Sequence, residues 1–216
     1  MAENMFDFSR TLAGEYLKSF PHLWDALDGL KDFICALGHT LGEEYVEQDK
    51  CVWVHRSASV HKSAHIAPPC IICAETEVRT GAYLRGGVLV GKNCVVGNST
   101  EIKNAVLFDG VQVPHFNYVG DSILGYRAHM GAGAITSNVK ADKSPVFITL
   151  EGKRYDTGRK KLGAILGDHV EIGCNCVLNP GTVVGKNTSV YPLTMLRGEY
   201  PSDSIVKSAE EVVKRM

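Results

Sequence analysis

Residues 84–102 read LRGGVLVGKNCVVGNSTEI, with an aliphatic side chain at every sixth position: Leu84, Val90, Val96 and Ile102. The same step continues toward the N-terminus through Val78, Ile72, Ile66, Val60 and Val54. A period of six fits neither the 3.6 residues of a helical turn nor the alternation of a simple strand. It is typical of short strands wound around a prism, in which each strand places one aliphatic side chain inside.

Beyond Ile102 the period continues with two one-residue slips and one interruption, through Leu107, Val113, Val119, Leu124, Met130, Leu166, Ile172, Leu178, Val184, Val190 and Leu196. Three hexads make one coil, so residues 18 apart stack about 4.8 Å from each other. Many of these residues precede a glycine, as at Gly91 and Gly97, which suits a tight corner. We therefore expect a mainly β protein with a parallel β-helix over residues 51–200. Nine consecutive positions in frame argue against the alternative, a β-sandwich with accidental spacing.

The flanking segments are expected to be helical. Leu23, Leu27, Leu30, Ile34 and Leu37 are spaced 4, 3, 4 and 3, which predicts an amphipathic helix ending at Gly38. With a shorter helix over residues 12–18, it would make residues 1–50 a helical cap on the open N-terminal end of the stack. The pattern Ser208-Ala-Glu-Glu211 resembles a capping box and predicts a short C-terminal helix within residues 201–216.

Between residues 139 and 164 the hexads stop. The segment Val146-Phe-Ile-Thr-Leu150, a Glu-Gly pair and Lys153-Arg-Tyr155 predict a hairpin inserted into the prism. This insertion carries seven lysines and arginines against three acids. Its basic character is consistent with anion binding or with a solvated loop, and the sequence leaves both readings open.

Composition excludes several classes. The chain has 216 residues and a formal net charge of −1, which gives no electrostatic reason to expect nucleic acid as a partner. No apolar run is long enough to span a membrane and the N-terminus lacks a signal pattern, so we expect a cytoplasmic protein without a membrane partner. The seven cysteines predict reduced, mostly buried thiols and no disulfide framework. The short pairs Cys70-x-x-Cys73 and Cys174-x-Cys176 lack matching histidines, so no metal site is expected.

Two cations occupy equivalent positions one coil apart. Arg85 follows the inward Leu84, and Lys103 follows the inward Ile102. Like charges on adjacent strands repel, so we expect an anion such as a phosphate between them. The alternative is that both long side chains splay into solvent.

A second group of polar residues lies at His115, Asn117 and Tyr118. A histidine can accept a proton near neutral pH, so His115 is a candidate general base. The small residues of Gly131-Ala-Gly-Ala-Ile-Thr-Ser-Asn138 would let a ligand approach backbone N–H groups. A structural histidine and a tightly packed coil are the corresponding alternatives.

Five motifs, in this order, resemble the acetyltransferase domain of bifunctional bacterial GlcNAc-1-phosphate uridyltransferase/glucosamine-1-phosphate acetyltransferases. They are Arg85-Gly-Gly, Glu101-Ile-Lys103-Asn, His115-x-x-Tyr118-x-Gly-Asp121, Gly131-Ala-Gly-x-Ile-Thr-x-Asn138 and Leu166-Gly-Asp168. The resemblance covers about half of the chain, and we expect the helical cap of residues 1–50 to stand in place of the nucleotidyltransferase domain of that family. It implies a left-handed β-helix, a homotrimer with sites between subunits, and acetyl-CoA as the acyl donor.

The resemblance also implies residue roles. His115 is similar to the general base, Ala132 and Cys174 lie where the family contacts the acetyl-CoA side, and a phosphorylated amino sugar would contact Arg85, Lys103, Tyr118, Asn138 and Lys161. The chain departs from the family at His129, Val139, Cys174 and Pro192, and the hairpin insertion has no equivalent. Most of these departures concern the sugar ring or the donor side, whereas the phosphate cations are retained.

The expected function is therefore acyl-CoA-dependent N-acyl transfer to an amino-sugar phosphate. The first alternative is a non-catalytic trimer that binds a sugar phosphate or nucleotide sugar and has lost the donor site. The second is a metal-dependent hydratase on the same fold, which would need histidine ligands from neighbouring subunits.

Overall fold

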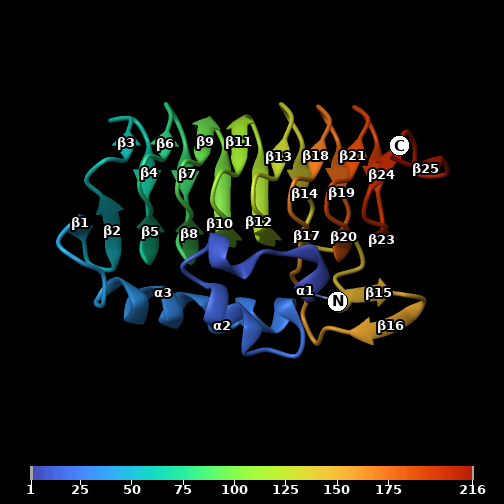
Figure 1. Ribbon diagram of the computed structural model, residues 1–216, viewed down its shortest axis with the longest axis horizontal. Helices are drawn as coiled ribbons and strands as arrows, with labels where there is room; N and C mark the ends of the chain where they lie inside the picture. The colour runs from blue at the N-terminus through green and yellow to red at the C-terminus, as the bar shows by residue number, and fades with distance from the viewer. Residues whose placement is uncertain (1, 216) are drawn as a thin grey trace.

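The computed structural model describes residues 2–215 and forms a left-handed parallel β-helix, as predicted (Figure 1). Each coil contributes one strand to each of three faces, which we call A, B and C in chain order. Face A contains β2 (Val52–His55), β5 (Cys70–Ile72), β8 (Val88–Val90), β17 (Ala164–Leu166), β20 (Thr182–Val184), β23 (Glu199–Tyr200) and the second halves of β10 (Glu101–Leu107) and β12 (Tyr118–Leu124).

The other two faces are built in the same way. Face B contains β3 (Ser59–Val60), β6 (Glu77–Val78), β9 (Val95–Asn98), β11 (Gln112–His115), β13 (His129–Met130), β18 (Glu171–Ile172), β21 (Ser189–Val190) and β24 (Ser204–Val206). Face C contains β4 (His65–Ile66), β7 (Tyr83–Leu84), the first halves of β10 and β12, β14 (Ile135–Thr136), β19 (Val177–Leu178) and β22 (Met195–Leu196).

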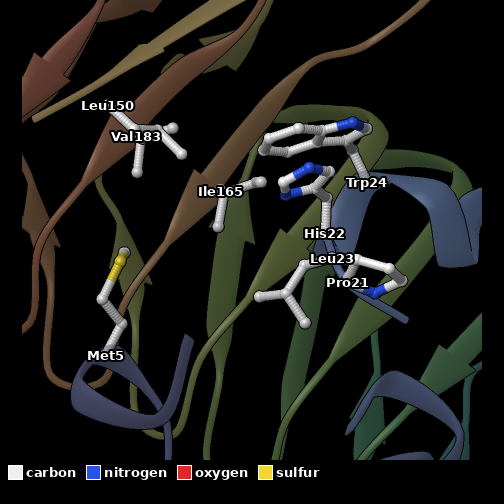
Figure 2. Close-up of a pocket in the computed structure, with 8 residues that line it drawn as sticks. All are labelled: Met5, Pro21, His22, Leu23, Trp24, Leu150, Ile165 and Val183. Carbon is white, nitrogen blue, oxygen red and sulfur yellow. The ribbon is translucent and has the colours of Figure 1, made fainter. Parts of the chain in front are cut away.

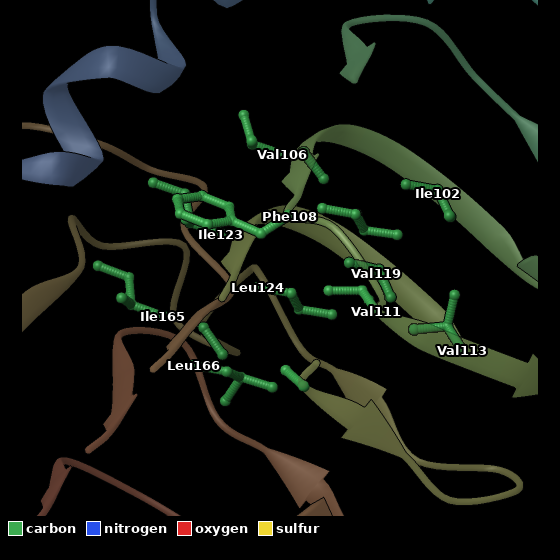
Figure 3. Packing of buried hydrophobic residues seen from close by; sticks show 14 of the residues in the cluster. Ile102, Val106, Phe108, Val111, Val113, Val119, Ile123, Leu124, Ile165 and Leu166 are labelled. Carbon is green, nitrogen blue, oxygen red and sulfur yellow. The ribbon is translucent and has the colours of Figure 1, made fainter. Parts of the chain in front are cut away.

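The predicted aliphatic positions form the interior of the prism (Figure 3). On face C, Leu84 pairs with Ile102 and Ile102 pairs with Val119, and all three are fully buried. The step from Ile102 to Val119 is 17 residues, one fewer than in a regular coil. The slip in the hexad frame therefore shortens one coil without breaking the register. In the following coil the inward residue is Thr136, whose hydroxyl accepts a hydrogen bond from the backbone N–H of Gly120 (2.9 Å).

The N-terminal helices do not cover the open end of the stack. α1 (Ala2–Met5), η1 (Phe8–Arg10), α2 (Gly14–Lys18), η2 (Leu23–Leu27) and α3 (Leu30–Gly38) lie along the prism beside face A (Figure 1). The expected long helix is divided at Asp28 and Gly29 into η2 and α3. The layer has this position because the outward residues of face A are apolar and each is at most 5% exposed: Trp53, Ile71, Leu89, Val106, Ile123, Ile165 and Val183. On face B the same position holds polar residues such as Glu77 and Gln112.

Hydrogen bonds at the corner between faces A and B, which we call the A/B corner, attach the first residues of the helical layer to the prism. The carboxylate of Asp168 accepts from the N–H groups of Asp7 and Tyr126, both at 2.7 Å. The N–H of Asp168 donates to the carbonyl of Met5, and the N–H of Asp109 donates to that of Arg10. Asp168 belongs to the motif Leu166-Gly-Asp168. Its hydrogen bonds connect the helical layer to the prism.

One cysteine pair corrects the expectation that all thiols are reduced. Cys35 of α3 and Cys51, in the turn between β1 (Tyr45–Asp49) and β2, form a disulfide with their Cα atoms 5.4 Å apart. Because the two cysteines lie 16 residues apart on different elements, spacing alone did not identify the pair. The other five cysteines are free, and among them Cys174 is exposed.

The predicted hairpin is present as β15 (Phe147–Leu150) and β16 (Lys153–Asp156), joined by a turn at Glu151 and Gly152 with positive φ angles. One side of it is packed, because Val146, Ile148 and Leu150 are buried. Between this side, face A and the helical layer lies an apolar cavity of about 50 Å³ (Figure 2). There the ring of His22 stacks on Trp24 at 4.5 Å.

The predicted C-terminal helix is wrong. Residues Val212–Lys214 form β25, which pairs antiparallel with β24. The hydroxyl of Ser208 does accept from the N–H of Glu211 (3.1 Å), as a helix cap would, but the contact closes a turn. The chain then returns along the open edge of β24, where the two valines find strand partners. At the other end of the stack, β1 pairs antiparallel with β2. Among the described helices, none is long and apolar enough to cross a membrane.

Candidate active site

Arg85 and Lys103 lie side by side at the C/A corner, as their 18-residue spacing predicted. Their counter-charges come from the protein itself. The guanidinium of Arg85 donates to the carboxylate of Glu101 at 2.6 Å, and the ammonium of Lys103 lies 3.7 Å from the carboxylate of Asp121. These cations are therefore neither splayed apart nor in need of an external anion, although both remain accessible from solvent.

Asp121 is the centre of this corner. It is 3% exposed and adopts a left-handed backbone conformation with φ of 48°. Its carboxylate accepts from the side-chain amides of Asn104 (2.9 Å) and Asn138 (2.5 Å). Because both partners are amides and Lys103 is close, the buried charge is compensated. Glu101 and Asp121 were not singled out from the sequence as site residues, although both lie inside the quoted motifs.

Tyr118 and Asn138 join the same cluster. The side-chain amide of Asn138 donates to the hydroxyl of Tyr118 at 3.2 Å. Burial, together with the charge of Asp121, raises the pKa of Tyr118, so its phenol stays protonated at neutral pH. The hairpin returns to the prism here, since the N–H of Leu162 donates to the carbonyl of Asn138. Lys161, which is exposed, therefore enters the corner beside Asn138.

The B/C corner holds the other predicted residues in one column. His115, Ala132 and Cys174 occupy equivalent positions on consecutive coils, and Pro192 occupies the next. The side chains of His115 and Cys174 are exposed. Within residues 2–215, neither the N–H of Ala132 nor that of Cys174 donates to any acceptor. These N–H groups are free to bind a carbonyl oxygen, whereas the proline that follows them has no N–H.

Asn117 has a structural role in the described chain. It is 3% exposed, and its side-chain amide donates to the carbonyls of Gly131 (2.8 Å) and Ala134 (3.0 Å). Its amide oxygen accepts from the N–H of His115 at 3.1 Å. It thus stabilises the turn that carries His115.

His129, one of the departures from the family pattern, lies on face B. Its Nδ1 is 2.7 Å from the carboxylate of Glu171, its register partner on the adjacent strand of the same face. Among the described residues, no group of three or more histidine, cysteine or acidic side chains is placed to hold a metal ion.

The two corners lie on opposite edges of face C in a single chain. The chain turns at Phe116 and again at Asp121, and the strand between them is extended. Five residues at about 3.3 Å per residue place the two turns roughly 16 Å apart. The single chain therefore presents a cationic, hydrogen-bonding cluster at one edge and a histidine with free N–H groups at the other.

Comparison with known proteins shows which proteins this chain is similar to. A protein named bifunctional protein GlmU from Methanococcus maripaludis is 36% identical over 132 residues, which are 61% of this chain and 32% of that protein. A bifunctional sugar-1-phosphate nucleotidylyltransferase/acetyltransferase from Sulfurisphaera tokodaii is 34% identical over 163 residues, with 67% and 40% covered. The resemblance inferred from the motifs is thus confirmed, and the chain spans about a third of the length of these relatives.

Among solved structures, LpxA from Acinetobacter baumannii matches with a TM-score of 0.43 and 15% identity, covering 72% of this chain and 68% of that one. A family model described as the GMPPB C-terminal domain matches residues 66–188, which is more than half of the chain. These residues include every candidate site residue at both corners. The chain belongs to the GMPPB C-terminal domain family.

Proposed function

We propose that the protein is an acyl-CoA-dependent N-acyltransferase that acts on an amino-sugar phosphate. The observation that carries the proposal is the column at the B/C corner, where His115 stands next to the free N–H groups of Ala132 and Cys174. A histidine beside unengaged backbone donors suits attack on a thioester carbonyl. The names of the relatives, which include an acetyltransferase, support the same class of reaction.

In the proposed reaction the sugar amine attacks the thioester carbon of acetyl-CoA. A C–N bond forms, the C–S bond breaks, and coenzyme A leaves as a thiol or thiolate. His115 accepts the proton that the amine must lose, because an ammonium group has no lone pair for the attack. The N–H groups of Ala132 and Cys174 would bind the carbonyl oxygen while it carries negative charge.

The cluster at the C/A corner would bind the acceptor. Arg85 and Lys103 supply cationic donors for a phosphate group, and Glu101 and Asp121 hold these cations in place when the site is empty of substrate. Tyr118 and Asn138 offer a hydroxyl and an amide to sugar oxygens, and Lys161 adds a further charge. Binding of the phosphate at a distance from the amine would orient the amine toward the thioester.

The distance between the two corners favours a site shared between subunits. In a homotrimer, the C/A corner of one copy and the B/C corner of the next would face each other across the subunit interface. Face A would take no part in this interface, because the helical layer already covers it.

A mass-spectrometric assay with glucosamine-1-phosphate and acetyl-CoA tests the proposal. The wild type is expected to form N-acetylated product, and His115→Ala is expected to lower the rate by roughly 10²- to 10⁴-fold. Arg85→Ala should raise KM for the phosphorylated sugar far more than for glucosamine itself, and equal effects on both would contradict the phosphate role. The matched control is Arg56→Ala, which removes an exposed arginine at the corner between faces A and B, where its guanidinium donates to the carbonyl of Glu43.

The ion pairs at the C/A corner and the proline at the end of the B/C column favour one alternative, a non-catalytic trimer that binds sugar phosphates. Absence of product with several amino-sugar phosphates and acyl donors, together with sugar-phosphate binding but no CoA binding in calorimetry, would identify this second function.

A further inference from the structure

The hairpin insertion and the prism together line a basic cavity, which lies further along the C/A corner than the proposed acceptor site. The cavity has a volume of about 260 Å³ and lies between the hairpin and the C/A corner. Phe147, Thr149 and Arg154 line it from the hairpin, Lys140 from the start of the insertion, and Asn179 and Arg197 from the prism. None of its lining residues in the described chain is a carboxylate.

Of the three cations that line the cavity, Lys140 has a carboxylate partner and donates to the hydroxyl of Ser144, whereas the two arginines have no carboxylate partner among the described side chains. The ammonium of Lys140 lies 3.6 Å from the carboxylate of Asp142, outside the cavity lining. Within residues 2–215, no carboxylate lies within 4 Å of the guanidinium groups of Arg154 and Arg197. Uncompensated cations that line one concave surface attract an anion, and arginine prefers the planar, multidentate contacts that a phosphate offers.

The hairpin holds Arg154 in a defined position. Val146 and Ile148 are buried on one side of the hairpin. The alternating side chains Phe147 and Thr149 therefore lie on its other side, where they line the cavity. Arg154 pairs with Thr149 across the hairpin, and its guanidinium lies 3.8 Å from the centre of the Phe147 ring. This packing and stacking argue against a freely solvated loop.

The cavity lies further along the C/A corner than the candidate active site, and none of its lining residues is one of the residues described there. Lys140 follows Asn138 by two residues, and Arg197 occupies the same column as Asn179. Arg197 lies four coils beyond Lys103 in the equivalent position, which corresponds to about 19 Å at the spacing of β-strands. A sugar monophosphate bound at Lys103 would not reach it, so a ligand that occupies both places would have to carry a further phosphate.

We propose that Lys140, Arg154 and Arg197 form a second phosphate-binding site, which takes the phosphate groups of a nucleotide. This inference deepens the proposed function, since the nucleotide would be part of one of its two substrates. The phosphate chemistry is shared by two sources: the 3′-phosphoadenosine end of coenzyme A, and the diphosphate of a nucleotide-activated sugar.

Isothermal titration calorimetry on the full chain tests the site without requiring catalysis. The probes are coenzyme A, dephospho-coenzyme A, which lacks the 3′-phosphate, uridine diphosphate and guanosine diphosphate. The Arg154→Gln/Arg197→Gln double variant is expected to bind one of these probe families at least tenfold more weakly than the wild type. Lys143→Gln is the matched control, because it removes a charge from the same insertion outside the cavity lining. It should leave every Kd within twofold.

The pattern of losses identifies the source. A loss confined to coenzyme A, with dephospho-coenzyme A bound equally by wild type and double variant, assigns the cavity to the acyl donor. A loss confined to the nucleoside diphosphates assigns it to the acceptor. Binding of no probe by the wild type, or equal Kd values for both proteins with every probe, would overturn the proposal. Failure of the transferase assay alone would leave these Kd differences intact, so the two proposals fail separately.

Discussion

At the scale of single residues, chemical reactivity separates Cys174 from the other free thiols. Burial raises the pKa of Cys73 to about 11 and also raises those of Cys70, Cys94 and Cys176. At neutral pH these four thiols are protonated, and all four cysteines are at most 1% exposed. Cys174 is exposed at the B/C corner.

We therefore expect N-ethylmaleimide to modify one cysteine per chain in the native protein, and none in Cys174→Ser. Intact-mass spectrometry measures this directly. If acetyl-CoA occupies the B/C corner as proposed, saturating acetyl-CoA should slow the modification of Cys174. Rapid labelling of two or more sites in the folded protein would contradict the burial of the other thiols.

Gly181 is a second residue with a measurable role. Its φ is +79°, and a Cβ there would lie 2.9 Å from the carbonyl oxygen of Phe147 and from a methyl group of Val146. Gly158 also has a positive φ, of +64°, but a Cβ there would meet nothing within 4 Å. Gly158→Ala should lower the unfolding free energy by about 1–2 kcal/mol through backbone strain alone. Gly181→Ala should cost more, because it also pushes the hairpin away from the prism. Urea denaturation measures both, and equal costs would show that the hairpin does not pack as closely as described.

At the scale of elements, the Cys35–Cys51 disulfide connects the helical layer to the first coil. For a loop of this length the chain-entropy model gives a stabilisation of about 3 kcal/mol. The Cys35→Ser/Cys51→Ser variant should therefore unfold at clearly lower urea concentration than the wild type under oxidising conditions. The matched control is Cys174→Ser, which removes a free thiol and should leave the midpoint unchanged.

A reducing agent should shift the wild type to the midpoint of the double variant without affecting that variant. The number of thiols provides an independent check. Labelling in denaturant without reductant should modify five cysteines per chain, and labelling after reduction should modify seven. Seven without reductant would contradict the disulfide.

The elements that the sequence predicted are those with a repeating signal. The hexads located the inward positions from Val54 to Leu196 because each coil repeats the same local requirement. The prediction of a C-terminal helix was wrong because a capping pattern describes only a local turn, whereas the open edge of β24 offers backbone partners to the residues that follow this turn. The place of the helical layer was missed for a different reason. Triplets such as Val88-Leu89-Val90 are apolar at the outward position as well, and this signal identifies face A as the buried one.

The candidate site was predictable in part, for the same reason. One uninterrupted coil of 18 residues separates Arg85 from Lys103, so the hexad spacing alone predicted that they lie side by side. Because of the insertion, Ala132 and Cys174 are 42 positions apart in the sequence, which hides their common column from any fixed period. The carboxylates that pair with the two cations depend on side-chain geometry, about which the hexad pattern says nothing.

At the scale of the whole molecule, the separation of the two corners predicts complementation between inactive variants. His115→Ala lacks the proposed base, and Lys103→Ala lacks a phosphate contact at the other edge of face C. If each site uses one corner from each of two copies, mixed trimers contain some sites with both residues intact. Random mixing in equal amounts should restore about a quarter of the wild-type activity.

The experiment requires co-expression or refolding of the mixture, with product formation as the measurement and each variant alone as the control. Light scattering should show a trimer for both variants, because complementation requires that each variant still assembles. A mixture no more active than its separate components would show that both residues serve a site within one chain.

The strand β25, which folds back on β24, has a consequence for the length of the stack. A parallel coil exposes backbone groups on which another coil can form, much as a crystal face accepts a further layer, so nothing in a hexapeptide repeat itself sets where growth stops. A reversed strand breaks this template, because its outer edge no longer matches the direction of an incoming coil. By reversing the chain at β1 and again at β25, the protein terminates its own repeat with the backbone alone and remains an object of defined size.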